Sequence, residues 1–290
     1  MSRWMMARRG GDFVEIGRQC GISPVLARLI RNRGALGVQE TQTYLHPALS
    51  GLADPFLLHG MEEAVSLLRD GIRAGKKIRI AGDYDVDGIC AAYILLEGLR
   101  RLGADVDAAL PDRMRDGYGL NVSMVRRAAA DGVGMLVTCD NGIAAAEAVR
   151  AAGQAGMTVL VTDHHEIPYC TEEDGTRREI LPEADCILEP WLTDPSTGKP
   201  WYPFPQICGA VVAWKLICAL EGKTDKTMLP FCALATVCDV MPLTGENRIL
   251  VKEGLEAMRH TDNPGLRALL EACGIDGRPL TAYHAGFVLG

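Results

Sequence analysis

Acidic residues and histidines gather in three short segments of this 290-residue sequence, and each segment follows a run of apolar residues. The segments are residues 83–88, 140–142 and 163–165. Carboxylates within a few ångströms of one another cannot all stay ionised unless cations lie between them. Carboxylate and imidazole ligands without thiolates suit Mn²⁺ or Mg²⁺ better than a structural zinc. The pattern therefore predicts a metal centre.

The chemistry expected of such a centre is phosphoester hydrolysis. Two ions about 3.5 to 4 Å apart can generate hydroxide from bound water and stabilise the attacking and leaving oxygens of a phosphoryl displacement. Gly88 opens the helix expected after the first acidic segment, so a phosphate or metal could approach the backbone closely there. The start of a helix also favours anions.

Each segment also has a simpler interpretation. Asp-Asn-Gly is a common turn, an aspartate after a strand often caps a helix, and paired histidines can be a hydrogen-bonded surface pair. The first segment matches the opening of an EF-hand calcium loop, but Ile94 stands where that loop needs its twelfth-position glutamate. An apolar strand also precedes it where an EF-hand has a helix. We therefore reject a calcium sensor.

The elements that must bring these segments together form an alternating pattern. We predict strands at Ile78–Ala81, 106–110, Met135–Thr138, Thr158–Thr162 and Cys186–Leu188. Helical patterns lie between them at 89–102, 121–130 and 143–153. This alternation predicts an α/β fold whose parallel sheet is covered by helices on both faces. Ligands of such sheets bind beyond the carboxyl ends of the strands, where the acidic segments lie.

The remaining chain divides around this core. Residues 1–60 form an N-terminal leader expected to pack on the core, 61–260 the catalytic domain, and 261–290 the start of a connection to a second domain. The leader has a helical patch at 24–31, and a further helix is expected at 61–74. Helical patterns at 207–221, 227–238 and 247–259 make the C-terminal part helical. Residues 169–179 are expected to form an exposed excursion.

Composition narrows the setting of the protein. The net charge of −7 gives no overall basic surface for nucleic acid, so positive charge would have to be local. The ten cysteines include no Cys-x-x-Cys pair and several lie in apolar runs, which fits reduced thiols in the cytoplasm. The longest mostly apolar stretch, residues 207–220, contains Lys215 and is too short to cross a bilayer. We expect no membrane association.

The acidic segments resemble the motifs of the DHH phosphoesterase superfamily, which is named for the sequence that stands here as Asp163-His164-His165. Within it they resemble the RecJ single-strand DNA exonucleases. The RecJ-like segments are residues 80–88, 138–143, 233–243 and 244–248, with shorter matches at 45–47, 54–56, 111–113, 117–120 and 202–204. The resemblance covers nearly the whole chain.

The resemblance implies a set of site residues. The implied metal ligands are Asp85, Asp87, Asp140, His164 and Asp239, with Asp140 as the bridge between two Mn²⁺ or Mg²⁺ ions. Asp83 would be a further ligand or would orient one. For Asp239 the resemblance is the only reason, because its expected helix does not by itself point at the strand ends.

Substrate-binding residues are implied as well. His165 would contact the scissile phosphate, or else support His164. Arg113 would grip a phosphate with its guanidinium, and Tyr118 would stack on a base. The alternatives are a solvated charge for Arg113 and a packed turn for Tyr118.

The activity implied is a 5′-to-3′ exonuclease on single-stranded DNA that serves repair and recombination. It would act as a monomer, beside a single-strand-binding protein or a helicase. The family's second domain and its oligonucleotide-binding fold have no counterpart in this sequence, so we expect a truncated catalytic core. Two alternatives are a phosphoesterase acting on short oligonucleotides or cyclic dinucleotides, and a non-catalytic replication scaffold.

Overall fold

Five parallel strands form the centre of the computed structural model, which describes residues 5, 7, 9–115, 117–172, 175 and 177–290. In spatial order they are β2 (Val106–Ala109), β1 (Ile78–Ala81), β3 (Met135–Thr138), β4 (Thr158–Thr162) and β7 (Cys186–Leu188). All four pairings are parallel. Strands β3 and β4 are almost wholly buried, which explains why they read as continuous apolar runs in the sequence.

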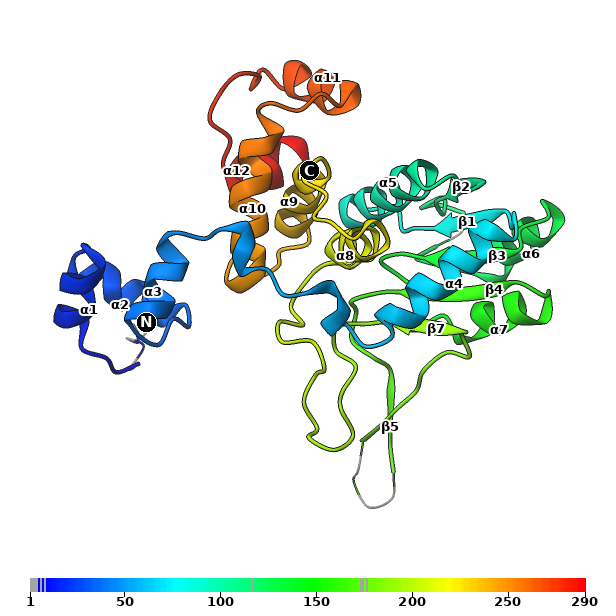
Figure 1. Ribbon diagram of the computed structural model, residues 1–290, viewed down its shortest axis with the longest axis horizontal. Helices are drawn as coiled ribbons and strands as arrows, with labels where there is room; N and C mark the ends of the chain where they lie inside the picture. The colour runs from blue at the N-terminus through cyan, green and yellow to red at the C-terminus, as the bar shows by residue number, and fades with distance from the viewer. Residues whose placement is uncertain (1–4, 6, 8, 116, 173–174, 176) are drawn as a thin grey trace.

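Helices cover both faces of this sheet, as predicted (Figure 1). One face packs against α4 (Met61–Arg73), α5 (Val86–Arg101) and α8 (Gly209–Glu221). The other face packs against α6 (Val122–Ala130) and α7 (Ala146–Gln154). The prediction began the last of these helices at residue 143, but the turn at Gly142, whose φ is 115°, delays its start.

Helix α8 is buried along its whole length because a second helical layer lies against it. This layer contains α9 (Leu229–Cys238) and α10 (Gly245–Met258), which pack against each other, and α9 also packs against α5. Helices α11 (Pro264–Ala272) and α12 (Ala282–His284) and a π-helical turn at Ala285–Leu289 follow. The helical C-terminal part is thus confirmed, although α11 was not predicted.

A buried carboxylate fastens the end of α5 to the loop that follows α8. Asp225 accepts hydrogen bonds from Arg101 and from the backbone and hydroxyl of Thr227. Burial alone would raise the pKa of Asp225, but the Thr227 and Arg101 hydrogen bonds outweigh it and hold the pKa below its usual value.

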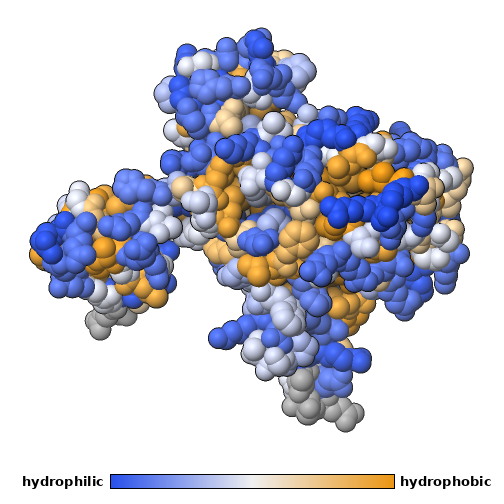
Figure 2. Space-filling model, viewed as in Figure 1, coloured by the Kyte–Doolittle hydropathy of each residue, from blue (hydrophilic) through white to orange (hydrophobic). Residues whose placement is uncertain are grey.

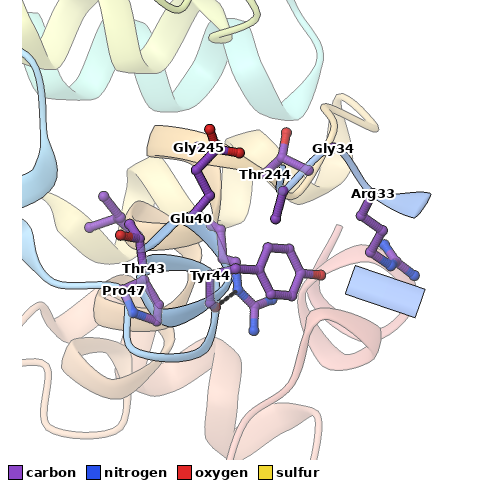
Figure 3. A pocket seen from close by; sticks show the side chains of 11 residues that line it. Arg33, Gly34, Glu40, Thr43, Tyr44, Pro47, Thr244 and Gly245 are labelled. Atoms are coloured by element: carbon purple, nitrogen blue, oxygen red, sulfur yellow. Dashed lines mark hydrogen bonds between the residues drawn. The ribbon is translucent and has the colours of Figure 1, made fainter. Parts of the chain in front are cut away.

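The N-terminal helices α1 (Phe13–Cys20), α2 (Pro24–Asn32) and α3 (Val38–Leu45) form a small group beside the main body (Figure 1). Two 3₁₀ turns, Leu49–Gly51 and Pro55–Leu57, lead from it to α4. The Arg248 guanidinium lies 3.9 Å from the Tyr44 ring, and its Nε donates to the Tyr44 carbonyl. Figure 3 shows the hollow of about 330 Å³ that this contact borders, between α3 and the start of α10.

The excursion predicted at 169–179 is an exposed two-stranded hairpin, apart from residues 173, 174 and 176, which lie outside the described residues. Strands β5 (Tyr169–Thr171) and β6 (Arg177–Glu179) pair antiparallel. In Figure 2 apolar colour gathers over the central helices, whereas the hairpin and α11 are mostly hydrophilic. Among the described residues no helix has the length and apolar character that a membrane span needs.

Candidate metal centre

The carboxyl ends of β1, β3 and β4 meet beside the first turns of two helices, α5 and α8. Asp87 lies in the first turn of α5 and is almost fully buried. Its Oδ2 accepts a hydrogen bond from the Gly209 amide at 2.7 Å, and its Oδ1 accepts one from the Ala210 amide at 2.8 Å. These amides begin α8, whose free N–H groups and dipole stabilise a negative charge. The two amides thus fix the Asp87 carboxylate against the start of α8.

His164 stands at the centre of the cluster. Its Nε2 lies 3.0 Å from Asp140 Oδ1, 3.5 Å from Asp87 Oδ2 and 3.8 Å from Asp239 Oδ2. Two groups of three side chains have ligand atoms that all lie within 4.8 Å of one another. One group is Asp87, His164 and Asp239, and the other is Asp140, His164 and His165. The two groups found among the described residues share His164 and therefore adjoin each other.

Two buried atoms in this cluster have no hydrogen-bond partner among the described residues. They are Asp140 Oδ1 and His164 Nε2, which face each other without hydrogen-bond geometry. Burial, followed by the charge of Asp87, raises the pKa of Asp140 well above its usual range. An unpaired buried carboxylate costs free energy, and a cation between these atoms would remove that cost. The donor set therefore fits Mn²⁺ or Mg²⁺.

Asp140 reaches this position through an unusual backbone conformation. Its φ is 59°, in the left-handed region that aspartate tolerates better than most residues. Across from it, Gly209 approaches so closely that a Cβ there would lie 2.7 Å from the Asp140 Cβ. The end of β3 and the start of α8 are thus held in direct contact.

Asp239 comes from a different part of the fold. It caps the C-terminus of α9, and Val240 after it has a φ of 56° and a largely exposed side chain. Because α9 packs against α5 and α8, its last residue reaches the cluster. Burial, followed by the charge of Asp87, raises the pKa of Asp239.

Asp163 does not join the cluster directly but orients His165. Its Oδ1 lies 2.7 Å from His165 Nδ1 and accepts from the His164 amide, while its Oδ2 accepts from the Ile143 amide. The hydrogen bond with Asp163 raises the pKa of His165. Burial alone would raise the pKa of Asp163, but the His165 contact lowers it below its usual value. This role was missed from sequence, although Asp163 is part of the motif.

Comparison with known proteins identifies the family of this chain. The family model described as "DHH family, N-terminal domain" matches residues 77–237, which is more than half of the chain. The chain belongs to the DHH family. The segment that matches the family model begins one residue before β1 and ends within α9.

The resemblance to RecJ is confirmed by sequence and by structure. The single-stranded-DNA-specific exonuclease RecJ of Bacillus subtilis is 34% identical over 99% of this chain and 35% of that protein. RecJ of Thermus thermophilus, solved in complex with Mn²⁺, superposes with a TM-score of 0.73 at 32% identity, over 95% of this chain and 37% of that one.

A second solved structure, an exonuclease RecJ bound to manganese, superposes with a TM-score of 0.68 at 34% identity. It covers 83% of this chain and 57% of that chain. The chain spans less than half the length of the curated RecJ relatives it matches.

Two predicted ligands of this DHH site lie outside both three-residue groups. Asp85 caps α5 by accepting from the Gly88 amide, and its Oδ2 accepts from the Tyr118 hydroxyl at 3.2 Å. Asp83 is fully buried, and its Oδ1 accepts from the Tyr84 amide. Its Oδ2 has no partner among the described residues. Both residues therefore remain predicted ligands at the edge of the DHH cluster.

Gly88, predicted to admit a phosphate or a metal, lies tightly against the backbone that follows β1. A Cβ at Gly88 would lie 2.6 Å from the backbone nitrogen of Asp83. This contact by itself requires glycine at position 88 and fixes the start of α5 against the strand.

Arg113 and Tyr118 both lie against the ring of Tyr84, the residue before Asp85. The Arg113 guanidinium lies 5.2 Å from the centre of the Tyr84 ring, and the Tyr118 ring meets that ring edge-on at 5.0 Å. Tyr118 also borders a hollow of about 370 Å³ whose other walls include Asp140, Ile143 and His165. Of the two residues predicted to bind substrate, Tyr118 therefore stands beside the cluster, and Arg113 lies against Tyr84.

Proposed function

We propose that this chain is the catalytic core of a metal-dependent phosphodiesterase, and that it acts as an exonuclease on single-stranded DNA. The observation that carries the proposal is the pair of ligand groups around His164, whose buried unpaired atoms call for a cation. The RecJ relatives named above, including two structures with manganese, support the same assignment.

In this proposal some residues of the site bind the metal ions and others contact the substrate. Asp87, Asp140, His164 and Asp239 hold the ions, with Asp85 and Asp83 at their edge. Bound Mn²⁺ or Mg²⁺ supplies a hydroxide nucleophile and stabilises charge on the phosphate. His165, which Asp163 turns toward the cluster, donates a hydrogen bond to a phosphate oxygen.

The residues predicted to bind substrate select a polynucleotide. Arg113 offers two parallel N–H donors to a phosphate, and Tyr118 offers its exposed ring to a base. A single strand can place its unstacked bases on such rings, whereas a duplex cannot. We propose cleavage from the 5′ end, in agreement with the RecJ resemblance.

The test combines metal binding with hydrolysis. Titration calorimetry should show binding of Mn²⁺, and the loaded chain should hydrolyse bis(p-nitrophenyl) phosphate. Asp140→Asn should weaken Mn²⁺ binding by more than about 100-fold and abolish hydrolysis, without destabilising the metal-free fold. The matched control is Asp105→Asn, because Asp105 is exposed and its carbonyl accepts a hydrogen bond from the Ile78 amide at the start of β1, at the opposite edge of the sheet from the cluster.

Substrate length and end chemistry test the exonuclease assignment. Oligothymidylates of 2 to 20 nucleotides should be cleaved faster as they lengthen, and a block at the 5′ end should stop cleavage where a 3′ block does not. Equal rates on all lengths would instead favour a phosphoesterase for short oligonucleotides. Hydrolysis that persists in Asp140→Asn would contradict the metal centre itself.

We also propose a cytoplasmic monomer that serves DNA repair and recombination beside a single-strand-binding protein or a helicase. The ten cysteines are all free thiols, which supports a reducing compartment. Co-purification from cells under reducing conditions, followed by light scattering, tests the partner and the oligomeric state.

A further inference from the structure

A second hollow, of about 710 Å³, lies next to the metal centre and is larger than the one bordered by Tyr118. One wall is the β5–β6 hairpin, which contributes Tyr169, Arg177 and Glu179. The facing wall is the connector after β7, which contributes Trp191, Thr193 and Pro200. Figure 1 shows the hairpin and the connector side by side, extending away from the sheet. The volume of the second hollow lies in the usual range of a ligand site.

Each wall contributes one aromatic residue, Tyr169 from the hairpin and Trp191 from the connector. The Tyr169 ring is partly exposed, and the Arg177 guanidinium lies 4.3 Å from its centre. The Trp191 amide donates to Oε1 of Glu189, which is buried, and Trp191 remains 37% exposed. A bridge between Thr193 and Pro200 closes the connector into a narrow loop. Two partly exposed aromatic residues therefore border the same hollow.

Consecutive residues of one segment border the second hollow and the hollow at the metal centre. His165 borders the hollow at the cluster, and the next two residues, Glu166 and Ile167, border the second hollow. Ile167 also packs against Ile143 and Leu192 in a small buried group. Ile143 in turn borders the hollow at the cluster. A chain whose phosphate lies at His165 can therefore extend directly into the second hollow.

We propose that this hollow binds nucleobases of the single strand beside the scissile phosphate, stacked on Trp191 and Tyr169. Glu166 and Glu179 also border it, and their carboxylates disfavour phosphates there. Aromatic faces accept any base, and the Arg177 guanidinium adds a cationic plane. The bases thus turn into the hollow while the backbone stays at the cluster. This inference rests on the proposed action on single-stranded DNA.

The test compares strands that differ only in their bases. Fluorescein-labelled dT₁₂ and an abasic strand of equal length carry the same phosphates, and binding of the full chain is measured by anisotropy in Ca²⁺ to prevent cleavage. The unmodified chain should prefer dT₁₂. Trp191→Ala and Tyr169→Ala should each weaken dT₁₂ binding by at least about fivefold and leave binding of the abasic strand unchanged. Trp191→Phe should keep most of the preference.

Trp201→Ala is the matched control. Trp201 belongs to the same connector and is similarly exposed, but it stacks on His59 at 5.3 Å and does not border the hollow. An equal loss in Trp201→Ala and Trp191→Ala, or no preference for dT₁₂ in the unmodified chain, would overturn the proposal. Hydrolysis of bis(p-nitrophenyl) phosphate reports the metal centre separately, because this small diester has no nucleotide chain that could extend from the cluster into the second hollow. If the unmodified chain did not hydrolyse this diester, the proposed function would be refuted, and not the binding of bases in the second hollow.

Discussion

Replacing Gly209 with alanine should disturb the metal centre without removing any ligand. A Cβ at this position would lie 2.7 Å from the Asp140 Cβ and 2.9 Å from its Cα. Ordinary contacts begin at 3.4 Å, so the side chain of Asp140 must retreat by about 0.7 Å (3.4 − 2.7) and its backbone by about 0.5 Å (3.4 − 2.9). Neither can move freely, because β3 pairs with strands on both sides.

The expected cost has two parts. Overpacking of a buried contact costs about 1–3 kcal/mol in the free energy of unfolding. Displacing Asp140 by half an ångström exceeds the roughly 0.2 Å tolerance of metal–ligand distances. We therefore expect Mn²⁺ affinity to fall by roughly 10- to 100-fold, as when a supporting group of a metal site is lost.

Urea unfolding and Mn²⁺ calorimetry measure the two effects, and Gly153→Ala provides the control. Gly153 lies in α7, and a Cβ added there would meet no atom within 4 Å, so alanine should stabilise the helix by about 0.5–1 kcal/mol and leave Mn²⁺ binding unchanged. If Gly209→Ala kept the stability and Mn²⁺ affinity of the unmodified chain, the close contact between α8 and Asp140 would not control the site.

Three further substitutions probe other parts of the argument. Asp163→Asn should lower the rate of diester hydrolysis by roughly 10-fold or more and change Mn²⁺ affinity less, because it weakens the hydrogen bond to His165 and removes no proposed metal ligand. An equal loss of Mn²⁺ affinity and of hydrolysis rate would refute this. Asp225→Asn should cost about 2 kcal/mol at neutral pH. The folded-state pKa of Asp225 is lowered, so its contribution to the free energy of unfolding is present above its unfolded pKa and is lost as the pH falls through the folded pKa. The urea midpoint of the variant should therefore change less between neutral and acidic pH than that of the unmodified chain. Gly98→Ala should lower the free energy of unfolding by about 1–3 kcal/mol, because the new Cβ would lie 2.5 Å from the Ile217 side chain. Adding Ile217→Val to this variant should restore part of the lost stability. If urea unfolding showed that the two effects simply add, residues 98 and 217 would not be in contact.

The sheet was predictable because its central strands, β3 and β4, are buried on both faces. Such strands show as continuous apolar runs bounded by polar turns, and β1, β3, β4 and β7 match their predicted bounds. Strand β2 ends one residue earlier than predicted. Helices between consecutive parallel strands then follow from the need for crossovers.

Helices α1, α3 and α11 were missed because they are short and largely exposed, so few apolar positions mark their period. Two signals were nevertheless present. Asp12 caps the start of α1, and Asn263 followed by proline caps α11. Capping residues would have located these helices better than hydrophobic periodicity does.

The site was predictable only where it depends on neighbouring strands. Asp87, Asp140 and His164 follow strands that are adjacent in the sheet, so their convergence is a consequence of topology. Asp239 arrives through the packing of α9 on α5 and α8, which no local pattern encodes. The same holds for the two amides of α8 that bind Asp87.

These contacts make the crossing of α5 and α8 part of the metal centre. Asp87 begins α5 but is bound by the first amides of α8, while Gly209 of α8 presses on Asp140. The distance between the two carboxylates is therefore set by how closely the two helices pack. Gly98 and Ile217 form that packing contact, one from each helix and away from the ligands. Because interiors transmit strain rather than absorb it, a methyl group added at Gly98 should reduce Mn²⁺ affinity as well as stability.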